Sequence, residues 1–382
     1  MLQEKEKLFL KLMKVLIAPD KFKGSLTAKE VCDAITAGVI EVFPEAEVTS
    51  IPMADGGEGT LDILKDLLDL EMVKLTVGDP YARPVKSWYG MKSQDAFIEM
   101  ALASGLQLLN EEEQSASKTS TLGTGELIQH AIDRGARNIH LFVGGSATND
   151  GGIGVAHALG FRFLDQFGKE LSAIGQNLGL IDTIQKPERS FQDITFQIIT
   201  DVKNPLLGSD GATNQYGPQK GAKKEELASL EQGMSHYANL IQEISGIDHA
   251  IKPGSGAAGG IGMSVMGLLK GEIRNGMETL LNITGFAKQV AQADLVITGE
   301  GKIDVQTLQG KVVHGVAKAG IKEGVPVVAI CGINQLNEEE WKGLGLQDAT
   351  SLKSPELTAE YCMQHAAELI CLRVSKMAGK LK

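Results

Sequence analysis

Short apolar runs rich in β-branched residues alternate along the chain with longer segments whose apolar residues recur every three to four positions. The short runs predict buried strands and the longer segments predict amphipathic helices, so the chain predicts an α/β protein. In the N-terminal part, KVLIAP (14–19) and EVTSIPM (47–53) predict strands, and a helix capped by Ser25 or Thr27 is expected between them up to about Phe43. TLDILKDLLDL (60–70) predicts a second helix.

The C-terminal part repeats this pattern. ADLVITG (293–299) and VPVVAIC (325–331) predict buried strands, with the helix GKVVHGVAKAGIKEG (310–324) between them. Each predicted strand at the two chain ends finishes in a polar loop that contains glycine, and the ligand site of an open parallel sheet lies outside the carboxyl ends of its strands. We therefore expect one parallel-sheet domain from residues 13–78 plus 286–382, with loops from both chain ends meeting at one crevice.

The middle of the chain, residues 79–285, predicts a second α/β domain inserted into the first and facing it across a cleft. It opens with the Pro-containing GDPYARPV, carries the predicted strands AFIEMA, NIHLFVG and TFQIIT, and holds the densest glycine clusters. Residues 1–12 are expected to be a charged N-terminal extension.

Composition narrows the range of partners. The net charge of −11 over 382 residues argues against nucleic acid or an anionic membrane, although a few lysines can still form a local pocket for an anionic small molecule. No run approaches the roughly 18 apolar residues of a membrane span, and no signal peptide is expected. The four cysteines have no metal-ligand spacing, which favours reduced thiols in a cytoplasmic protein. A homodimer is one candidate assembly.

Charged residues gather in the loops that follow the predicted strands of the first domain. PDKFKGS can bring a lysine to a phosphate or carboxylate, or it can be a solvated loop in which a hydroxyl only caps the helix. TGEGKID alternates charge with glycine, which is unusual for a plain connection. The candidates in these loops and in MADGGEGT are Asp20, Lys23, Ser25, Asp55, Glu300, Lys302 and Asp304.

Two glycine clusters and one carboxylate are the candidates in the inserted segment. GGSATNDGGIG (144–154) offers bare backbone and small hydroxyls around Asp150, and KPGSGAAGGIG opens a helix whose N-terminus can seat a phosphate or can simply pack closely. Asp201 follows the strand TFQII, where a carboxylate suits a general base, a Mg²⁺ ligand or an Asx-turn. The other candidates in the two clusters are Ser146, Thr148, Gly254, Gly256 and Gly259.

Common nucleotide and hydrolase signatures do not apply. A Walker A pattern is absent, and the GxGxxG at Gly254 follows Lys-Pro rather than a buried strand, which excludes a dinucleotide-binding turn. No GxSxG elbow supports a Ser/His/Asp hydrolase.

Taken together, the motifs resemble the bacterial glycerate kinases of the type I group. APDKFKGSLTAKEV, PMADGGEGT, ALASGL, GTGELI, GGSATNDGG, TDVKNPLLG with GPQKGA, GSGAAGGIG, and TGEGKID with QTLQGK occur in the order seen in that family, from Met13 onward. The resemblance implies two α/β domains, one of them flavodoxin-like and discontinuous, with the active site between them. Lys302 stands where members often carry Arg. The lysine keeps the positive charge but cannot make the bidentate contact to a carboxylate or phosphate that Arg makes.

The resemblance also implies the reaction, in which ATP and Mg²⁺ are used to phosphorylate glycerate, with 2-phosphoglycerate favoured over 3-phosphoglycerate. Asp201 would accept the hydroxyl proton, Lys23 and Lys302 would neutralise phosphate or carboxylate charge, and Asp304, with Asp55, would hold Mg²⁺; base and metal ligand can be exchanged. The remaining candidates would bind substrate or phosphate. A non-catalytic sugar-acid-binding protein and a phosphohydrolase using the same anion site stay open as alternatives.

Overall fold

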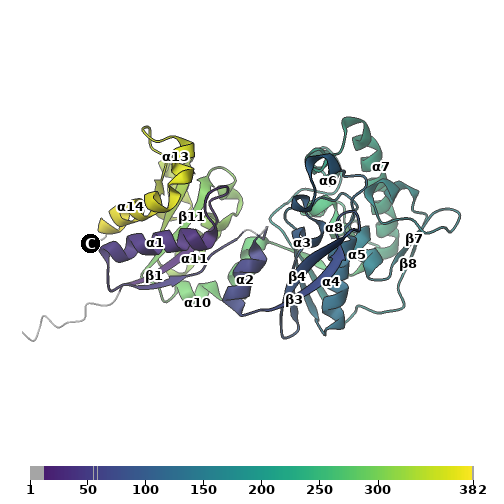
Figure 1. Ribbon diagram of the computed structural model, residues 1–382, viewed down its shortest axis with the longest axis horizontal. Coiled ribbons are helices and arrows are strands. Elements are labelled where there is room, and N and C mark those ends of the chain that lie inside the picture. Colours follow the sequence, from purple (N-terminus) through teal and green to yellow (C-terminus); the bar gives the residue numbers. More distant parts are fainter. Residues whose placement is uncertain (1–12, 55, 58, 381–382) are drawn as a thin grey trace, which may run out of the picture. The chain divides into compact units, whose positions relative to one another are not determined.

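The computed structural model describes residues 13–54, 56–57 and 59–380, which form two compact units. The terminal unit combines the two ends of the chain, up to residue 54 and from Met277 onward. The central unit runs from Gly56 to Gly276. Figure 1 shows the elements of both units, coloured along the sequence.

The terminal unit is built on a five-stranded parallel sheet in the order β13-β12-β11-β1-β2. Counted within the unit, this is the 2-1-3-4-5 order of flavodoxin-like folds, so the predicted fold class is confirmed. Its strands are β1 (Lys14–Pro19), β2 (Glu47–Ser50), β11 (Leu295–Ile303), β12 (Val327–Asn334) and β13 (Leu346–Ser351). Its helices are α1 (Ala28–Val42), α10 (Phe286–Val290), α11 (Val312–Glu323), α12 (Glu338–Gly343), α13 (Ala359–Gln364) and α14 (Ala366–Gly379). The helix α9 (Gly276–Ile283) begins at the boundary between the units.

The core of the terminal unit follows the alternation of its strands. Val15 and Ile17 of β1 point into a buried cluster with residues of α1 and α14, two helices that run side by side in Figure 1. The helix α11 packs against β1, β11 and β12. Thr27 caps α1 in a capping box with Glu30, an arrangement that stabilises a helix by about 1 kcal/mol.

The central unit contains a six-stranded mixed sheet in the order β10-β9-β6-β5-β4-β3 and a two-stranded sheet. Its strands are β3 (Glu71–Gly78), β4 (Pro84–Lys92), β5 (Asp95–Glu99), β6 (Asn138–Phe142), β7 (Arg162–Leu164), β8 (Thr183–Gln185), β9 (Thr195–Ile199) and β10 (Glu272–Arg274). Its helices are α2 (Thr60–Leu68), α3 (Ala101–Ser104), α4 (Leu122–Asp133), α5 (Ile153–Ala158), α6 (Ala212–Tyr216), α7 (Lys224–Ser245) and α8 (Ile261–Leu268). Strands β5, β6, β9 and β10 are parallel, so their carboxyl ends share one edge.

The unit boundaries lie at 55/56 and 276/277, whereas the sequence pattern predicts them at 78/79 and 285/286. The reason is that β3 pairs with β4 along its whole length, which makes GDPYARPV the turn of a hairpin rather than a link between domains. Gly56 and Gly276, the two ends of the central unit, also lie together: a Cβ on Gly56 would be 3.3 Å from Gly276 Cα.

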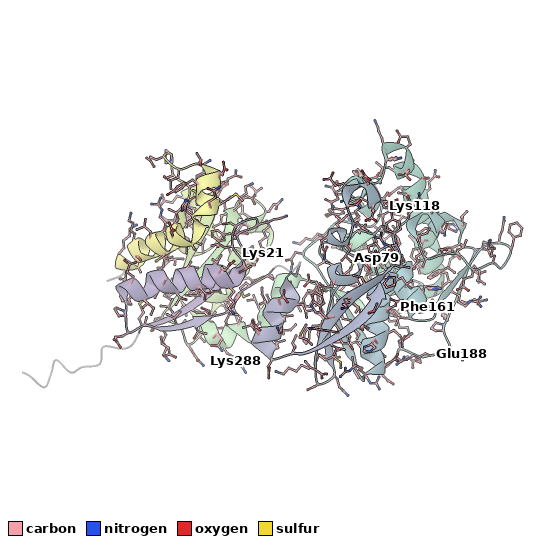
Figure 2. All side chains as sticks on the ribbon, in the orientation of Figure 1. Lys21, Asp79, Lys118, Phe161, Glu188 and Lys288 are labelled. Atoms are coloured by element: carbon pink, nitrogen blue, oxygen red, sulfur yellow. The ribbon has the colours of Figure 1, made fainter. Side chains whose placement is uncertain are left out.

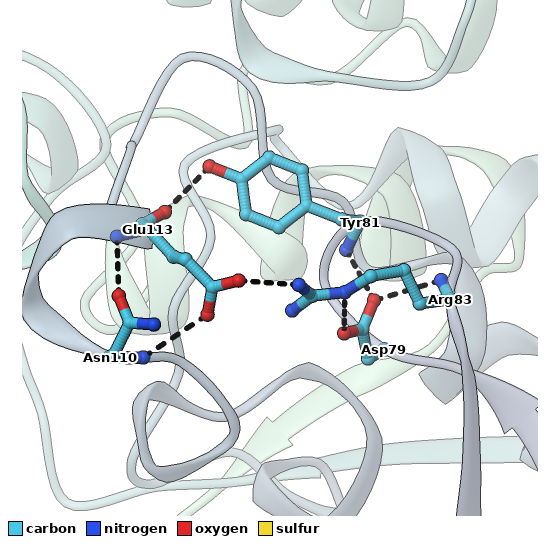
Figure 3. A network of polar contacts seen from close by, with 5 residues as sticks. All are labelled: Asp79, Tyr81, Arg83, Asn110 and Glu113. Carbon is cyan, nitrogen blue, oxygen red and sulfur yellow. Dashed lines mark hydrogen bonds and ion pairs between the residues drawn. The ribbon is translucent and has the colours of Figure 1, made fainter.

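A polar network fixes this hairpin turn (Figure 3). Asp79 accepts hydrogen bonds from the backbone N–H groups of Tyr81 and Arg83, at 2.8 and 2.9 Å, and from Arg83 Nε at 2.6 Å. Arg83 also contacts the carboxylate of Glu113, and the Tyr81 hydroxyl donates to the Glu113 carbonyl oxygen at 2.6 Å. The charged turn residues therefore have a structural role.

Candidate functional site

The first group of candidate residues lies on the loop between β1 and α1, which includes Lys21, labelled in Figure 2. The Asp20 carboxylate accepts a hydrogen bond from the backbone N–H of Lys21 at 2.7 Å. The Ser25 hydroxyl donates to the carbonyl oxygen of Met363 in α13 at 2.5 Å. The loop is therefore held at both ends, with the exposed side chain of Lys23 between them.

The second group lies at the end of β11. TGEGKID was expected to be a loop, and this expectation is wrong, because β11 continues to Ile303 and Lys302 and Ile303 pair with Ile333 and Asn334 of β12. Glu300 and Lys302 are two positions apart, so they point to the same face of the strand. The Glu300 carboxylate is buried and accepts a hydrogen bond from the Thr307 hydroxyl at 2.6 Å.

Lys302 and Asp304 form an ion pair, with Nζ 2.9 Å from Oδ2. Burial of the Asp304 carboxylate would raise its pKa, but the hydrogen bonds from Lys302 and from the backbone N–H of Gln306 outweigh it and lower the pKa. Asp304 is therefore an ionised carboxylate at neutral pH. Mg²⁺ typically binds through one or two carboxylates together with water and phosphate oxygens, so this oxygen donor fits the ion.

These two groups meet at one cavity of about 340 Å³ in the terminal unit. Five of the predicted residues line it: Asp20, Lys23, Ser25, Glu300 and Lys302. Lys21 and Lys311 line it too. Lys311 immediately precedes α11, and its place in QTLQGK gave no signal in the sequence beyond its charge.

In the central unit, the loop GGSATNDGGIG is organised by Asp150. The carboxylate is fully buried and accepts four hydrogen bonds, from Thr121 N and Oγ1 at 2.8 Å each, from Gly152 N at 3.1 Å and from Gly154 N at 3.3 Å. Burial raises its pKa, while the four hydrogen bonds favour the charged form. The predicted contact between Asp150 and a ligand does not fit this burial; the side chain ties the loop to the start of α4 instead.

The same loop covers a buried lysine that the sequence did not single out. Lys220, from GPQKGA, donates from Nζ to the Ser146 hydroxyl at 2.8 Å and to the Thr148 carbonyl oxygen at 2.7 Å. Its side chain is buried, which lowers the pKa to about 7 although Asp150 favours the charged form. Ser146 and Thr148, predicted to bind substrate, are themselves buried and hold Lys220 in this structure.

The glycines of KPGSGAAGGIG serve close packing. The N–H groups of Gly254 and Gly256 both donate to the Asn204 carbonyl oxygen, at 3.2 and 3.1 Å. A Cβ on Gly256 would lie 2.1 Å from the Pro205 carbonyl oxygen, and one on Gly259 would lie 2.0 Å from that of Thr148. Of the two interpretations of this segment, the contacts favour packing over a phosphate seat.

Asp201 follows β9, as the sequence predicts, and is tied to the segment after the neighbouring strand β10. Its Oδ1 accepts a hydrogen bond from the Gly276 N–H at 2.9 Å and a second one from the Asn275 amide. The side chain is half-buried. These donors hold the carboxylate in a fixed position, which a general base requires.

Asp55 lies outside the described residues. Within the described ranges no group of three or more His, Cys, Asp and Glu side chains is arranged to hold a metal ion. None of the described helices is long and apolar enough to cross a membrane. That the candidates of the terminal and central units serve one reaction stays a prediction.

Comparison with known proteins gives a consistent result over nearly the whole chain. Residues 15–382 match the glycerate kinase family. The chain is 41% identical over 374 residues to the glycerate kinase of Bacillus cereus, covering 97% of this chain and 98% of the relative. It is 40% identical over 324 residues to the glycerate 2-kinase of Escherichia coli K12, covering 84% and 85%. A solved Salmonella typhimurium LT2 protein described as a glycerate kinase 2 aligns with a TM-score of 0.85 at 37% identity, over 97% of this chain and 98% of that one.

Proposed function

The chain belongs to the glycerate kinase family, and from this premise we propose that it transfers the γ-phosphoryl group of ATP to a hydroxyl of glycerate. The observation that carries the proposal is the match over residues 15–382 together with the cluster of lysines and carboxylates at the carboxyl ends of β1 and β11. The relative named glycerate 2-kinase favours 2-phosphoglycerate as the product.

Phosphoryl transfer requires the protein mainly to position the reactants and to neutralise negative charge. Asp201, whose carboxylate is held by Asn275 and Gly276, accepts the proton of the attacking glycerate hydroxyl. The hydroxyl oxygen bonds to the γ-phosphorus while the bond from that phosphorus to the bridging oxygen breaks, and ADP leaves. Lys23 and Lys302 balance the negative charge of the phosphates or of the substrate carboxylate.

Mg²⁺ belongs to this proposal as the partner of ATP, where it would neutralise phosphate charge. Asp304 is the described carboxylate proposed to hold it, directly or through water, because it is ionised and close to the lysine cluster. The cytoplasm is the proposed site of action; all four cysteines are free, in keeping with a reducing compartment.

The test is a measurement of ADP release with purified protein, ATP, Mg²⁺ and glycerate, followed by phosphorus NMR of the product. We expect ADP release that depends on glycerate and a product phosphorylated at O2. Release of inorganic phosphate without an acceptor would favour a phosphohydrolase. Glycerate binding without any turnover would favour a sugar-acid-binding protein.

A further inference from the structure

The cavity of the terminal unit has two chemically different sides. One side carries four lysines, Lys21, Lys23, Lys302 and Lys311, and two carboxylates, Asp20 and Glu300. Asp304 pairs with Lys302, so one positive charge remains in excess. The other side is apolar. It is formed by Ile333 of β12, by Leu352, which follows β13, and by Ala359, Cys362, Met363 and Ala366 of α13 and α14.

The apolar side has no partner in glycerate, a three-carbon acid with a carboxylate and two hydroxyls. A cavity of about 340 Å³ also falls in the range of roughly 300–1,000 Å³ that is typical for ligands of drug size. A purine nucleoside triphosphate has both required parts, a flat apolar ring system and a polyanionic tail.

The position of the cavity relative to the sheet also supports a nucleotide as its ligand. It is lined by the loop after β1 and by the end of β11, and these adjacent strands are where the strand order reverses. Such a switch point is where open α/β sheets bind nucleotides and other ligands.

The cavity is also pre-formed. The Ser25 hydroxyl joins the β1–α1 loop to the Met363 carbonyl oxygen, and a Cβ on Gly24 would lie 3.1 Å from Met363 Cε. Met363 itself is 48% exposed and lines the cavity. A thioether in this position suits an aromatic ring, since sulfur makes favourable contacts with ring edges.

We propose that this cavity binds the purine nucleoside triphosphate, with the ring on the apolar side near Met363 and the phosphates on the lysine side. The inference rests on the proposed kinase function and goes further by giving the nucleotide its place and orientation within the terminal unit. Glycerate then binds elsewhere than on the apolar side.

The first test fills the apolar side. Ala359, the first residue of α13, is exposed and lines the cavity, whereas its neighbour Glu360 is exposed and does not. Isothermal titration of the full chain with Mg²⁺ and β,γ-imido-ATP should show affinity at least about tenfold weaker for Ala359→Trp, about 1.4 kcal/mol. The matched Glu360→Trp variant should bind as the wild type does.

The second test determines the orientation. Lys311, which immediately precedes α11, lines the cavity, and Lys318, exposed on α11, does not. Lys311→Ala should weaken binding of the triphosphate several-fold and leave adenosine binding unchanged, while Lys318→Ala should change neither. Ala359→Trp should weaken both ligands.

The outcomes separate this inference from the proposed function. If the wild type phosphorylates glycerate but Ala359→Trp changes neither the affinity for the nucleotide nor its KM, the assignment of the cavity is wrong and the kinase function stands. If the wild type binds the nucleotide without phosphorylating glycerate and Ala359→Trp abolishes that binding, the assignment stands and the function fails. Equal weakening of adenosine and triphosphate by Lys311→Ala would overturn the orientation.

Discussion

Replacing Asp150 by Asn distinguishes a carboxylate that shapes a loop from one that contacts a ligand. In the structure Oδ2 accepts three hydrogen bonds and Oδ1 accepts one, from Gly152 N. An Asn side chain with its oxygen in the place of Oδ2 keeps the three but turns its NH₂ group towards the Gly152 N–H.

The expected loss of stability follows from the number of hydrogen bonds that change. One hydrogen bond to a charged group, worth about 1.5–3 kcal/mol, is lost, and a buried donor faces another donor. Three further bonds lose their charge assistance, while removal of a buried charge offsets part of the cost. We expect Asp150→Asn to lower the free energy of unfolding by about 2–4 kcal/mol.

The assay uses the distribution of tryptophans, Trp88 in β4 of the central unit and Trp341 in α12 of the terminal unit. In a Trp341→Phe background, fluorescence during urea unfolding reports the central unit. Asp165→Asn is the matched control, because that carboxylate also accepts two backbone hydrogen bonds, at 2.9 Å each, but lies in a more exposed turn. The control should change stability by less than about 1 kcal/mol. If Asp150→Asn is as stable as the control yet loses activity, the carboxylate serves a ligand and our assignment to the loop is wrong.

Three further predictions concern charged groups. Lys302→Ala should lower kcat/KM by about 10²-fold, and Lys302→Arg should keep most activity. Both should change stability by less than about 1 kcal/mol, because the Lys302 side chain is half-exposed. Equal activities of the two variants would mean that Lys302 is only a surface charge. Asp201→Asn should lower kcat by about 10²–10⁴-fold with unchanged affinity for β,γ-imido-ATP; recovery at high Mg²⁺ would instead identify a metal ligand. Burial lowers the pKa of Lys220 to about 7 from 10.5, so unfolding takes up a proton between these values. Urea unfolding should therefore show wild-type stability rising, relative to Lys220→Met, by up to about 1.4 kcal/mol per pH unit between pH 7 and pH 10.5. A difference that stays constant over this range would contradict the lowered pKa of Lys220.

The sequence predicted the elements that are determined by residues close together along the chain. KVLIAP became β1 and TFQII became β9 because short apolar segments rich in β-branched residues suit buried parallel strands. The capping box at Thr27 lies within three residues, so it too is visible in the sequence. The position of Asp201 just after β9 was predictable because the strand itself was.

Features that depend on tertiary contacts were not visible. The strand β11 runs on through Glu300 and Lys302 because β12 continues beside it, although charge and glycine in TGEGKID resemble a loop. Lys220 sits in a polar, Pro-containing stretch, and only the fold buries it beneath Ser146 and Thr148. Likewise, glycine clusters indicate close approach to the backbone, but the sequence cannot say whether the neighbour is a ligand or, as at Gly259, another carbonyl group.

The contact between Gly56 and Gly276 has a consequence for synthesis and folding of the chain. β1 pairs with β11, so the N-terminal strand must wait for a partner that is made some 280 residues later. Joining the ends of an unfolded segment of roughly 220 residues costs about 5 kcal/mol of chain entropy, from 1.5RT ln n. The central unit is continuous, so it can fold as it emerges, and its folding brings its own ends together. β1 and β11 are then separated by about 55 residues of unfolded chain instead of about 276, and by the same relation the entropic cost of pairing them falls by about 1.4 kcal/mol.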